Sequence, residues 1–346
     1  MAAVDEPCGQ GFGLDSGNSE KKMRLAKLLV ALIALGAAGL SGCALQIPSG
    51  LRGVAPVPVD FSAPGRWETI RQIRYADISR DNLQGILRPI DWVYLVTMAG
   101  FQTESYGISI GPDDDVRYTT DGGQTWTKTS AALNCRHGLE IVSEKVAWHC
   151  GNGGTRVSTD GGRTWQTTAP SLCPFLSFQD ARSGWAASPY ALQSTVDGGN
   201  SWQSLALPAG AQDLAATSLR TMKDGYLLDV AGNLFVTADS GRSWETGSLG
   251  LAPGEQLITG SEGPKAVMRF LDDRRGLVVF DLPDGTVWSA TTQDGGRTWR
   301  RVEISEIANQ SLYYHLYLSR DGRLLTVTDD FNNGANTSLV LRYRQS

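Results

Sequence analysis

Histidine is scarce in this sequence, and basic residues form no cluster. The 346 residues include 3 His, and 36 acidic residues outnumber 31 basic ones, so the formal net charge is −5. With no basic run and no DNA- or RNA-binding motif, we expect no nucleic-acid partner. No CxxC or HxxxH spacing occurs, and we therefore expect no metal and no cofactor. The residues leave one zinc set open as an alternative, which comprises Cys135, His137, His149 and Cys150.

The sequence also lacks an apolar run long enough to span a bilayer comfortably. Leu28–Leu40 follows a positively charged flank but is too short for a transmembrane helix. This run ends in Leu-Ser-Gly-Cys at Cys43, a tetrad that resembles the bacterial lipobox. The resemblance implies that the signal is cut before Cys43 and that this cysteine is lipidated. An ordinary signal peptide or a short membrane anchor is the alternative.

The N-terminal region indicates the domain boundaries. Residues 1–43 are expected to be a leader and lipoprotein signal peptide, in which residues 1–22 would be a mis-called extension ahead of a conventional start at Met23. Residues 44–65 contain four prolines and little periodicity, which predicts an extended tether. Residues 66–346 are left for one folded domain.

Glycine and tryptophan, in contrast, are plentiful, and one motif that uses both occurs five times. In Ser158–Trp165, a hydroxyl residue lies two positions before Asp160, a glycine two after, a threonine four after and a tryptophan five after. A carboxylate at a hairpin turn accepts backbone N–H groups that lack partners, glycine supplies positive φ, and tryptophan covers a neighbouring sheet. We therefore interpret the aspartates as structural. The motif residues are Asp121, Asp160, Asp197, Asp239, Asp294, Trp126, Trp165, Trp202, Trp244 and Trp299.

The spacing of the motif predicts an all-β fold. Successive copies lie roughly 40 residues apart, a period typical of a β-propeller with four-stranded antiparallel blades. Between two copies, Phe175–Phe178 is predicted to be an inner strand. The last unit, Leu312–Arg342, lacks the motif, and a strand near Trp67–Tyr75 is expected to complete it, because ring closure removes exposed sheet edges. Six blades result, or seven if residues 66–100 form a blade of their own.

Three cysteines fall within the predicted propeller, at Cys135, Cys150 and Cys173. Cys135 and Cys173 stand at matching places in successive repeats, which favours a disulfide between neighbouring blades. A disulfide between Cys135 and Cys150, within one blade, is the other pairing that the spacing allows. Some disulfide is expected if the domain lies outside the cytoplasm.

The repeated motif resembles the Asp-box, or BNR repeat, of sialidases, sortilin-like receptors, xyloglucan hydrolases and photosystem II assembly factors. In these families the box lies at the periphery of a propeller blade, and its aspartate is structural. The chain is most similar to the photosystem II stability and assembly factor-like family of exported bacterial lipoproteins. The resemblance implies a membrane-tethered, extracytoplasmic scaffold of the bacterial cell envelope that is not catalytic. Its expected partners are the membrane, through the lipid anchor, and another envelope protein.

A sialidase-type glycoside hydrolase shares the repeat and is the alternative function. Such enzymes need three arginines that hold the substrate carboxylate and a tyrosine nucleophile paired with a glutamate. The resemblance assigns Arg88 and Arg269 to the arginines, and Tyr313 or Tyr314 to the nucleophile. However, the motif places no glutamate, and the residues after Arg88 are Pro-Ile, where the sialidases have Ile-Pro. The non-enzyme is therefore favoured, although three arginines meeting a tyrosine and a glutamate at the hub would favour the enzyme.

Overall fold

The computed structural model of the chain divides into two units, Met1–Ala55 and Pro56–Ser346. All described residues lie in the second unit. They are residues 59, 61, 65–74, 98–111, 115–133, 138–151, 154–258, 266–307, 314–329 and 337–345. Within these ranges the structure is built of strands, with one short 3-10 helix, η2 (Ser305–Ile307). No helix among the described residues is long and apolar enough to cross a membrane.

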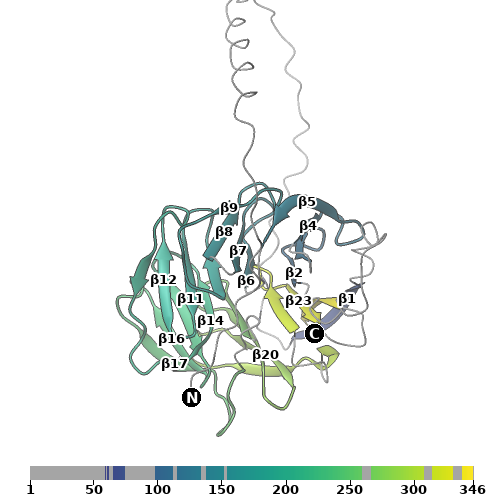
Figure 1. The fold of residues 1–346 in the computed structure, drawn as a ribbon. Coiled ribbons are helices and arrows are strands. Elements are labelled where there is room, and N and C mark those ends of the chain that lie inside the picture. The colour runs from purple at the N-terminus through teal and green to yellow at the C-terminus, as the bar shows by residue number, and fades with distance from the viewer. Residues whose placement is uncertain are drawn as a thin grey trace, which may run out of the picture. The chain divides into compact units, whose positions relative to one another are not determined.

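Six four-stranded antiparallel sheets form the blades of a β-propeller (Figure 1). This result confirms the predicted fold class and the count of six. From the innermost strand outward, the first three blades are β2 (Met98–Phe101), β3 (Gly107–Ile110), β4 (Asp115–Thr119) and β5 (Thr127–Ala132); β6 (Gly138–Ile141), β7 (Ala147–Gly151), β8 (Gly154–Ser158) and β9 (Gln166–Thr167); and β10 (Phe175–Phe178), β11 (Gly184–Ser188), β12 (Ala191–Thr195) and β13 (Gln203–Leu205). The predicted inner strand Phe175–Phe178 is therefore β10.

The next two blades follow the same order from the innermost strand to the outermost. They are β14 (Leu214–Leu219), β15 (Gly225–Asp229), β16 (Asn233–Thr237) and β17 (Glu245–Ser248); and β18 (Ala266–Phe270), β19 (Gly276–Asp281), β20 (Val287–Thr292) and β21 (Arg300–Glu303). Innermost strands of successive blades contact one another around the whole ring, from β2 through β22 and back to β2. We call the space that these six strands enclose the hub.

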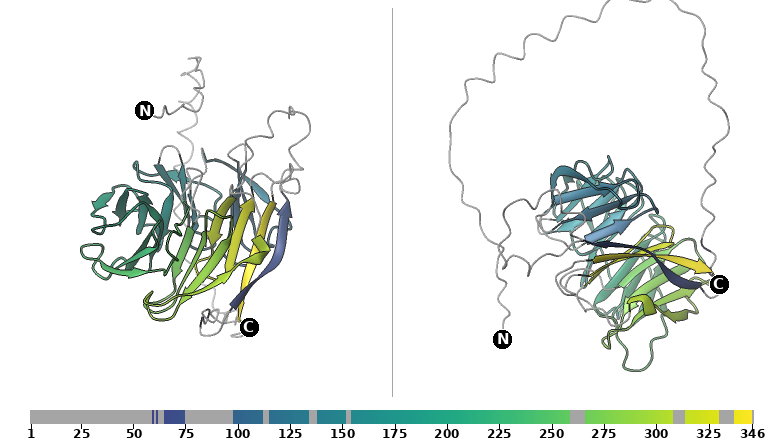
Figure 2. Two further views of the ribbon diagram at one scale, coloured as in Figure 1. Left: turned by 90° about the horizontal axis from the view of Figure 1, so that it is seen from below. Right: turned by 90° about the vertical axis from the view of Figure 1, so that its right-hand side faces the viewer.

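The sixth blade joins the two ends of the domain. Its strands are β22 (Tyr314–Leu318), β23 (Leu324–Asp329), β24 (Thr337–Gln345) and, outermost, β1 (Gly65–Arg74). Figure 2 shows β1 in purple beside the yellow strands of this sheet. The pairing confirms that an N-terminal strand completes the last blade. The alternative of a seventh blade is wrong, because β1 belongs to the sheet of β22–β24 and β2 to the sheet of β3–β5, and the described strands form six sheets.

Apolar burial holds β1 in place at the edge of the sixth blade. Its register runs antiparallel from Gly65 opposite Gln345 to Arg74 opposite Thr337. Trp67 is 2% exposed and packs edge-on against Tyr343, with ring centroids 5.4 Å apart. Burial of a large aromatic side chain contributes on the order of 2 kcal/mol or more. This contact keeps the last strand pair closed.

Aromatic stacking joins neighbouring blades. Trp148 on β7 lies over Phe178 on β10, with ring centroids 3.8 Å apart. Tyr226 on β15 lies in the same way over Phe270 on β18, at 3.5 Å. In both pairs the second strand of one blade packs against the innermost strand of the next. Such stacked pairs add about 0.5–1.5 kcal/mol to the burial of the rings, so each seam between blades is itself part of the core.

Candidate functional site: Asp-box corners and an arginine-lined hub

Each copy of the repeated motif folds into a corner between the third and the outermost strand of its blade. In all five corners one carboxylate oxygen of the aspartate accepts the hydroxyl of the residue four positions on, at 2.6 Å. The other oxygen accepts the backbone N–H of that same residue at 2.9–3.0 Å. It also accepts the hydroxyl two positions before the aspartate at 2.8–2.9 Å. We call this arrangement the Asp-box corner.

These bonds keep the carboxylates ionised. Hydrogen bonds from the Ser201 side chain, its backbone N–H and Thr195 lower the pKa of Asp197 from its usual 3.8 to about 2. Equivalent bonds, led by the hydroxyl of Ser243, lower the pKa of Asp239 to about 2. A carboxylate whose acceptor sites are taken by its own corner is poorly suited to exchange protons with a substrate near neutral pH.

Glycine allows the corner to turn tightly. The two residues after each aspartate have positive φ, for example 75° at Gly161 and 76° at Gly162. The first of these two positions is glycine in four corners. In the fifth it is Ser240, whose φ is also positive, at 67°. A Cβ on Gly199 would lie 2.7 Å from Cβ of Thr168, so the second glycine is required by space as well as by backbone conformation.

The corner also fastens one turn of its blade to another. The first N–H after the aspartate donates to a backbone carbonyl in the connection between the two inner strands of the same blade, which we call the inner turn. The five bonds, 2.6–2.9 Å long, join Gly122 N to Ser105 O, Gly161 N to Lys145 O, Gly198 N to Arg182 O, Ser240 N to Lys223 O and Gly295 N to Arg274 O. Corners and inner turns therefore lie on the same face of the propeller.

The tryptophan that ends the motif packs against another aromatic ring, on its own blade or, for Trp244, on Trp185 of the preceding blade. Trp202 meets Phe178 edge-on, with ring centroids 6.2 Å apart, and Trp299 meets Phe270 in the same way at 6.0 Å. Edge-to-face contacts at this separation are favourable because the positive ring edge faces a negative ring face. The five aspartates thus lie one per blade at separate corners, and they do not share a cavity.

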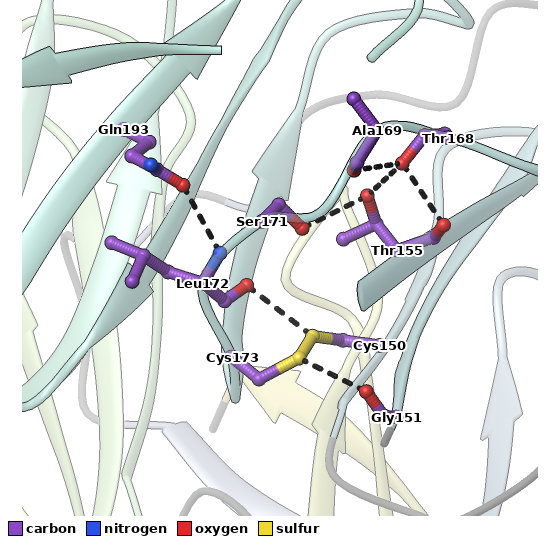
Figure 3. Close-up of a disulfide and its surroundings, with 9 residues drawn as sticks. All are labelled: Cys150, Gly151, Thr155, Thr168, Ala169, Ser171, Leu172, Cys173 and Gln193. Carbon is purple, nitrogen blue, oxygen red and sulfur yellow. Dashed lines mark hydrogen bonds between the residues drawn. A yellow bond between two sulfur atoms is a disulfide. The ribbon is translucent and has the colours of Figure 1, made fainter. Parts of the chain in front are cut away.

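A disulfide links the second and third blades. Cys150 on β7 is bonded to Cys173, which lies just before β10, and their Cα atoms are 5.9 Å apart (Figure 3). Both pairings expected from the spacing, Cys135 with Cys173 and Cys135 with Cys150, are therefore wrong. Cys135 lies outside the described residues. The pairing was missed because the second strand of one blade, here β7, lies beside the start of the innermost strand of the next blade, here β10.

The disulfide also bears on the zinc alternative. With its sulfur bonded to Cys173, Cys150 has no thiolate to offer a metal. His149, the next residue along the strand, points to the opposite side of the sheet. His137 lies outside the described residues. Within those that are described, no group of three or more His, Cys, Asp or Glu side chains is arranged to hold a metal ion.

Among the residues assigned by the sialidase resemblance, one can be placed in the site. Arg269 lies on β18, and its side chain points into the hub, where it forms an ion pair with Glu140 of β6. Tyr314 is the first residue of β22. Its backbone is described, but its side chain is not. Arg88, Tyr313 and the lipidation candidate Cys43 lie outside the described residues.

Side chains from opposite blades meet across the hub. The ion pair of Arg269 and Glu140 joins the fifth blade to the second, and both side chains are largely buried, at 12% and 4% exposed. The guanidinium of Arg320, in the inner turn of the sixth blade, donates to the carbonyl of Phe178 in the third. Burial lowers the pKa of Arg320 from its ordinary value, but a guanidinium remains charged at any physiological pH.

Two cavities lie along the hub, and the Arg269–Glu140 pair is part of the lining of both. One has a volume of about 50 Å³ and is mostly apolar. The other has a volume of about 270 Å³ and lies among the inner turns of the last three blades. We call the second one the mouth cavity. Its charged lining residues are Glu140, Arg220, Arg269, Arg275, Arg320 and Asp321.

Sequence reasoning missed most of these charged residues. Arg220, Arg275 and Arg320 occupy inner turns in three successive blades, directly after the innermost strand or within the turn that follows it. In a closed ring those turns converge at one end of the hub. The recurrence of arginine at these turns was therefore a signal in the sequence, and it becomes readable once the blade order is known.

A tyrosine, Tyr317, also lies at the hub, where its hydroxyl is hydrogen-bonded to two other blades. The hydroxyl of Tyr317 lies 3.2 Å from both the carbonyl of Ile141 and Oε1 of Gln102. Complete burial, and next the charge of Glu140, raise the pKa of Tyr317 well above its usual value. The two cavities along the hub are thus lined by four arginines, a glutamate and a tyrosine, the residue types that the enzyme alternative requires. The glutamate, however, is paired with Arg269 and leaves the phenol without a carboxylate base.

Five corners on a closed six-bladed ring define an Asp-box β-propeller. In agreement, the family model BNR/Asp-box repeat matches residues 117–128 and 156–167. The corners at Asp197, Asp239 and Asp294 have the same geometry outside those matches. The Asp-box corner is therefore present in five of the six blades.

Proteins that are similar to the chain include a photosystem II assembly lipoprotein and two solved YCF48 structures. The photosystem II assembly lipoprotein Ycf48 of Prochlorococcus marinus is 24% identical over 323 residues, which cover 80% of this chain and 85% of that protein. The structure of YCF48 from Cyanidioschyzon merolae has a TM-score of 0.46 at 14% identity and covers 72% of this chain and 83% of its own. The structure of YCF48 bound to D1 peptide has a TM-score of 0.41 at 14% identity and covers 84% of this chain and 98% of its own.

Proposed function

We propose that this protein is a membrane-tethered, extracytoplasmic β-propeller that acts as a non-catalytic protein-binding or assembly scaffold. Lipidation at Cys43 would anchor it in the bacterial cell envelope, and residues 44–65 would hold the propeller away from the membrane surface. The disulfide between Cys150 and Cys173 supports a location outside the cytoplasm, where disulfides persist.

The observation that carries this proposal is that the polar side chains at the hub are bound to groups of other blades. Glu140 and Arg269 pair with each other, Arg320 binds a backbone carbonyl, and the hydroxyl of Tyr317 binds acceptors of two other blades. Groups that bridge blades in this way stiffen the ring and are not free to act as acid, base or nucleophile. A rigid disc with a polar mouth suits the binding of a partner.

The similarity to the Prochlorococcus protein supports the same conclusion. That relative is called an assembly lipoprotein, and its alignment covers 80% of this chain. A scaffold role and a lipid anchor are both consistent with the Cys43 tetrad and the tether. The partner we propose is another envelope protein, bound on the face of the propeller that carries the inner turns and the mouth cavity.

In-cell photo-crosslinking tests the proposed partner and its face. A photoreactive amino acid is placed either at Arg182, exposed in an inner turn, or at Tyr190, which is 73% exposed between β11 and β12 at the other end of the strands. Because inner turns surround the mouth cavity, we expect the Arg182 position to give one defined adduct with an envelope protein, and the Tyr190 position to give none. Adducts are identified by mass spectrometry.

Two outcomes would contradict the proposal. The first is the absence of any defined adduct from either position. The second is turnover of a sialoside or of an aryl glycoside by the purified protein. The enzyme alternative requires that Arg269→Ala and Tyr314→Phe abolish such turnover, whereas Arg300→Gln, a charge change on the outermost strand β21, leaves it intact. Turnover with that pattern would make the protein a hydrolase.

A further inference from the structure

The mouth cavity contains more guanidinium donors than acceptors. Nε of Arg220 and Nε of Arg269 are buried, and neither has a hydrogen-bond partner among the described residues. Arg320 spends one donor on the carbonyl of Phe178, although a guanidinium has five. Buried donors without acceptors are unfavourable, and these two side chains line the mouth cavity together with Arg320.

The charges around the cavity do not cancel. Arg220 pairs with Asp224 at 2.8 Å, Arg275 pairs with Asp272 at 2.7 Å, and Arg269 pairs with Glu140. The remaining acid, Asp321, lies 3.7 Å from the guanidinium of Arg323. Arg320 makes no ion pair with any residue that the structure describes. One uncompensated positive charge therefore faces the cavity.

Hydroxyl groups add to the polar lining. Ser177 Oγ accepts the N–H of Leu219 at 2.8 Å, and Ser218 Oγ accepts the N–H of Phe270 at 3.0 Å. Both serines line the mouth cavity. A hydroxyl that accepts from the backbone still has its own proton to donate. The inner strands of two successive blades, β10 and β14, thus present hydroxyl donors beside the arginines.

We propose that the mouth cavity binds a carboxylate group of a polypeptide partner, through Arg320 together with Arg220. This inference rests on the proposed function. A guanidinium fork matches the two oxygens of a carboxylate, and desolvation inside a cavity strengthens the pairing. A volume of about 270 Å³ is roughly that of nine water molecules in the liquid, which is room for an acidic side chain or for the last residue of a chain.

Two sources of the carboxylate are distinguished with defined peptides. All three peptides carry the same N-terminal fluorophore, a neutral dye without a carboxyl group. Hexaglutamate with an amidated C-terminus carries only side-chain carboxylates. Hexaglutamine with a free C-terminus carries only a terminal one, and amidated hexaglutamine carries none. Fluorescence anisotropy with the full-length protein measures their binding. We expect one of the first two peptides to bind, and amidated hexaglutamine to show no binding.

Variants assign the binding to the cavity. Arg320→Gln is expected to weaken the affinity for the binding peptide about tenfold or more, because a charge-assisted fork is lost. Arg320→Lys, which keeps the charge but not the fork, should fall between. Since Arg320 also links the sixth blade to the third, Arg220→Gln is a second variant that leaves that link in place. Arg300→Gln, which removes an exposed arginine on β21, should change the affinity less than twofold, a difference of well under 1 kcal/mol.

Several results would overturn the inference. Equal binding of all three peptides, binding of neither carboxylate peptide, or equal losses in Arg320→Gln and Arg300→Gln would each do so. Inorganic phosphate that binds at Arg320 while both carboxylate peptides fail would show a site for small anions instead. Failure of the proposed function is separate. An adduct from position 182 that survives Arg320→Gln rejects only the carboxylate site, whereas the loss of every wild-type adduct rejects the scaffold.

Discussion

Each Asp-box aspartate contributes its carboxylate to its own corner. Asp160 accepts the hydroxyls of Ser158 and Thr164 and the backbone N–H groups of Arg163 and Thr164. Hydrogen bonds to a charged group contribute about 1.5–3 kcal/mol each before solvent competition reduces them. The residues that make these bonds all lie within eight positions of sequence, so the corner forms wherever the motif occurs.

Asp160→Ala tests this structural role. The variant removes an acceptor shared by four donors in a half-buried corner, and we expect the free energy of unfolding to fall by about 1–3 kcal/mol. Chemical denaturation monitored by tryptophan fluorescence measures the change. Thr159→Ala, at an exposed neighbour, serves as the control. Unchanged stability of Asp160→Ala would show that the corner does not depend on its aspartate.

At the scale of the element, each blade depends on the next. Second strands pack against the innermost strand of the following blade through stacked rings, and between the second and third blades a disulfide reinforces this seam. Hydrogen bonds beside it tie the same segment down, since Leu172 N donates to Oε1 of Gln193 at 3.1 Å and the hydroxyl of Ser171 meets that of Thr155 at 3.0 Å (Figure 3).

The double variant Cys150→Ala/Cys173→Ala tests the seam. A disulfide that closes a loop of 23 residues restricts the unfolded chain, and its loss is expected to cost about 3 kcal/mol of stability. The midpoint of unfolding in guanidinium chloride measures the effect. Wild-type protein treated with a reductant and denaturant should unfold at the lower midpoint of the variant. Equal midpoints for the oxidised wild type and the variant would contradict this expectation.

Blade-level prediction from the sequence was accurate where patterns are local. Phe175–Phe178 was predicted as an inner strand and is β10, and the strand predicted near Trp67 does complete the sixth blade. The cysteine pairing was wrong because equivalent positions in successive repeats were assumed to face each other. In the ring, the second strand of a blade instead faces the beginning of the next inner strand, and that offset brings Cys150 to Cys173.

The propeller that the structure describes is a ring closed in two ways. At the rim, β1 pairs with β24 and covers the last open edge of the sheet. Across the hub, the Arg269–Glu140 pair and the bond from Arg320 to Phe178 connect opposite blades. Links of this kind resist relative movement of the blades, so the face that carries the mouth cavity is presented as one surface.

The proposed tether makes a prediction about the whole chain in the cell. Cys43→Ala removes the sulfur that would carry the lipid, and the remaining apolar run, Leu28–Leu40, is too short to span a bilayer comfortably. We expect the variant to move from the membrane fraction to the soluble fraction, measured by immunoblot after ultracentrifugation. Cys173→Ala, within the propeller, is the control that should stay with the membranes. An unchanged distribution of Cys43→Ala would argue against lipidation at this residue.

The sequence by itself determined the corners and the four-stranded blades, because the bonds that make a corner close within one turn and the repeat spacing sets one sheet per copy. It left the number of blades at six or seven, and the pairing of β1 with β24 decided for six. Only the tertiary structure decided that Cys150 meets Cys173, that Glu140 meets Arg269, and that Arg220 and Arg320 line one cavity. These partners lie on different blades, and closure of the ring brings them face to face. A local sequence pattern does not specify which residues of distant blades come into contact across the hub.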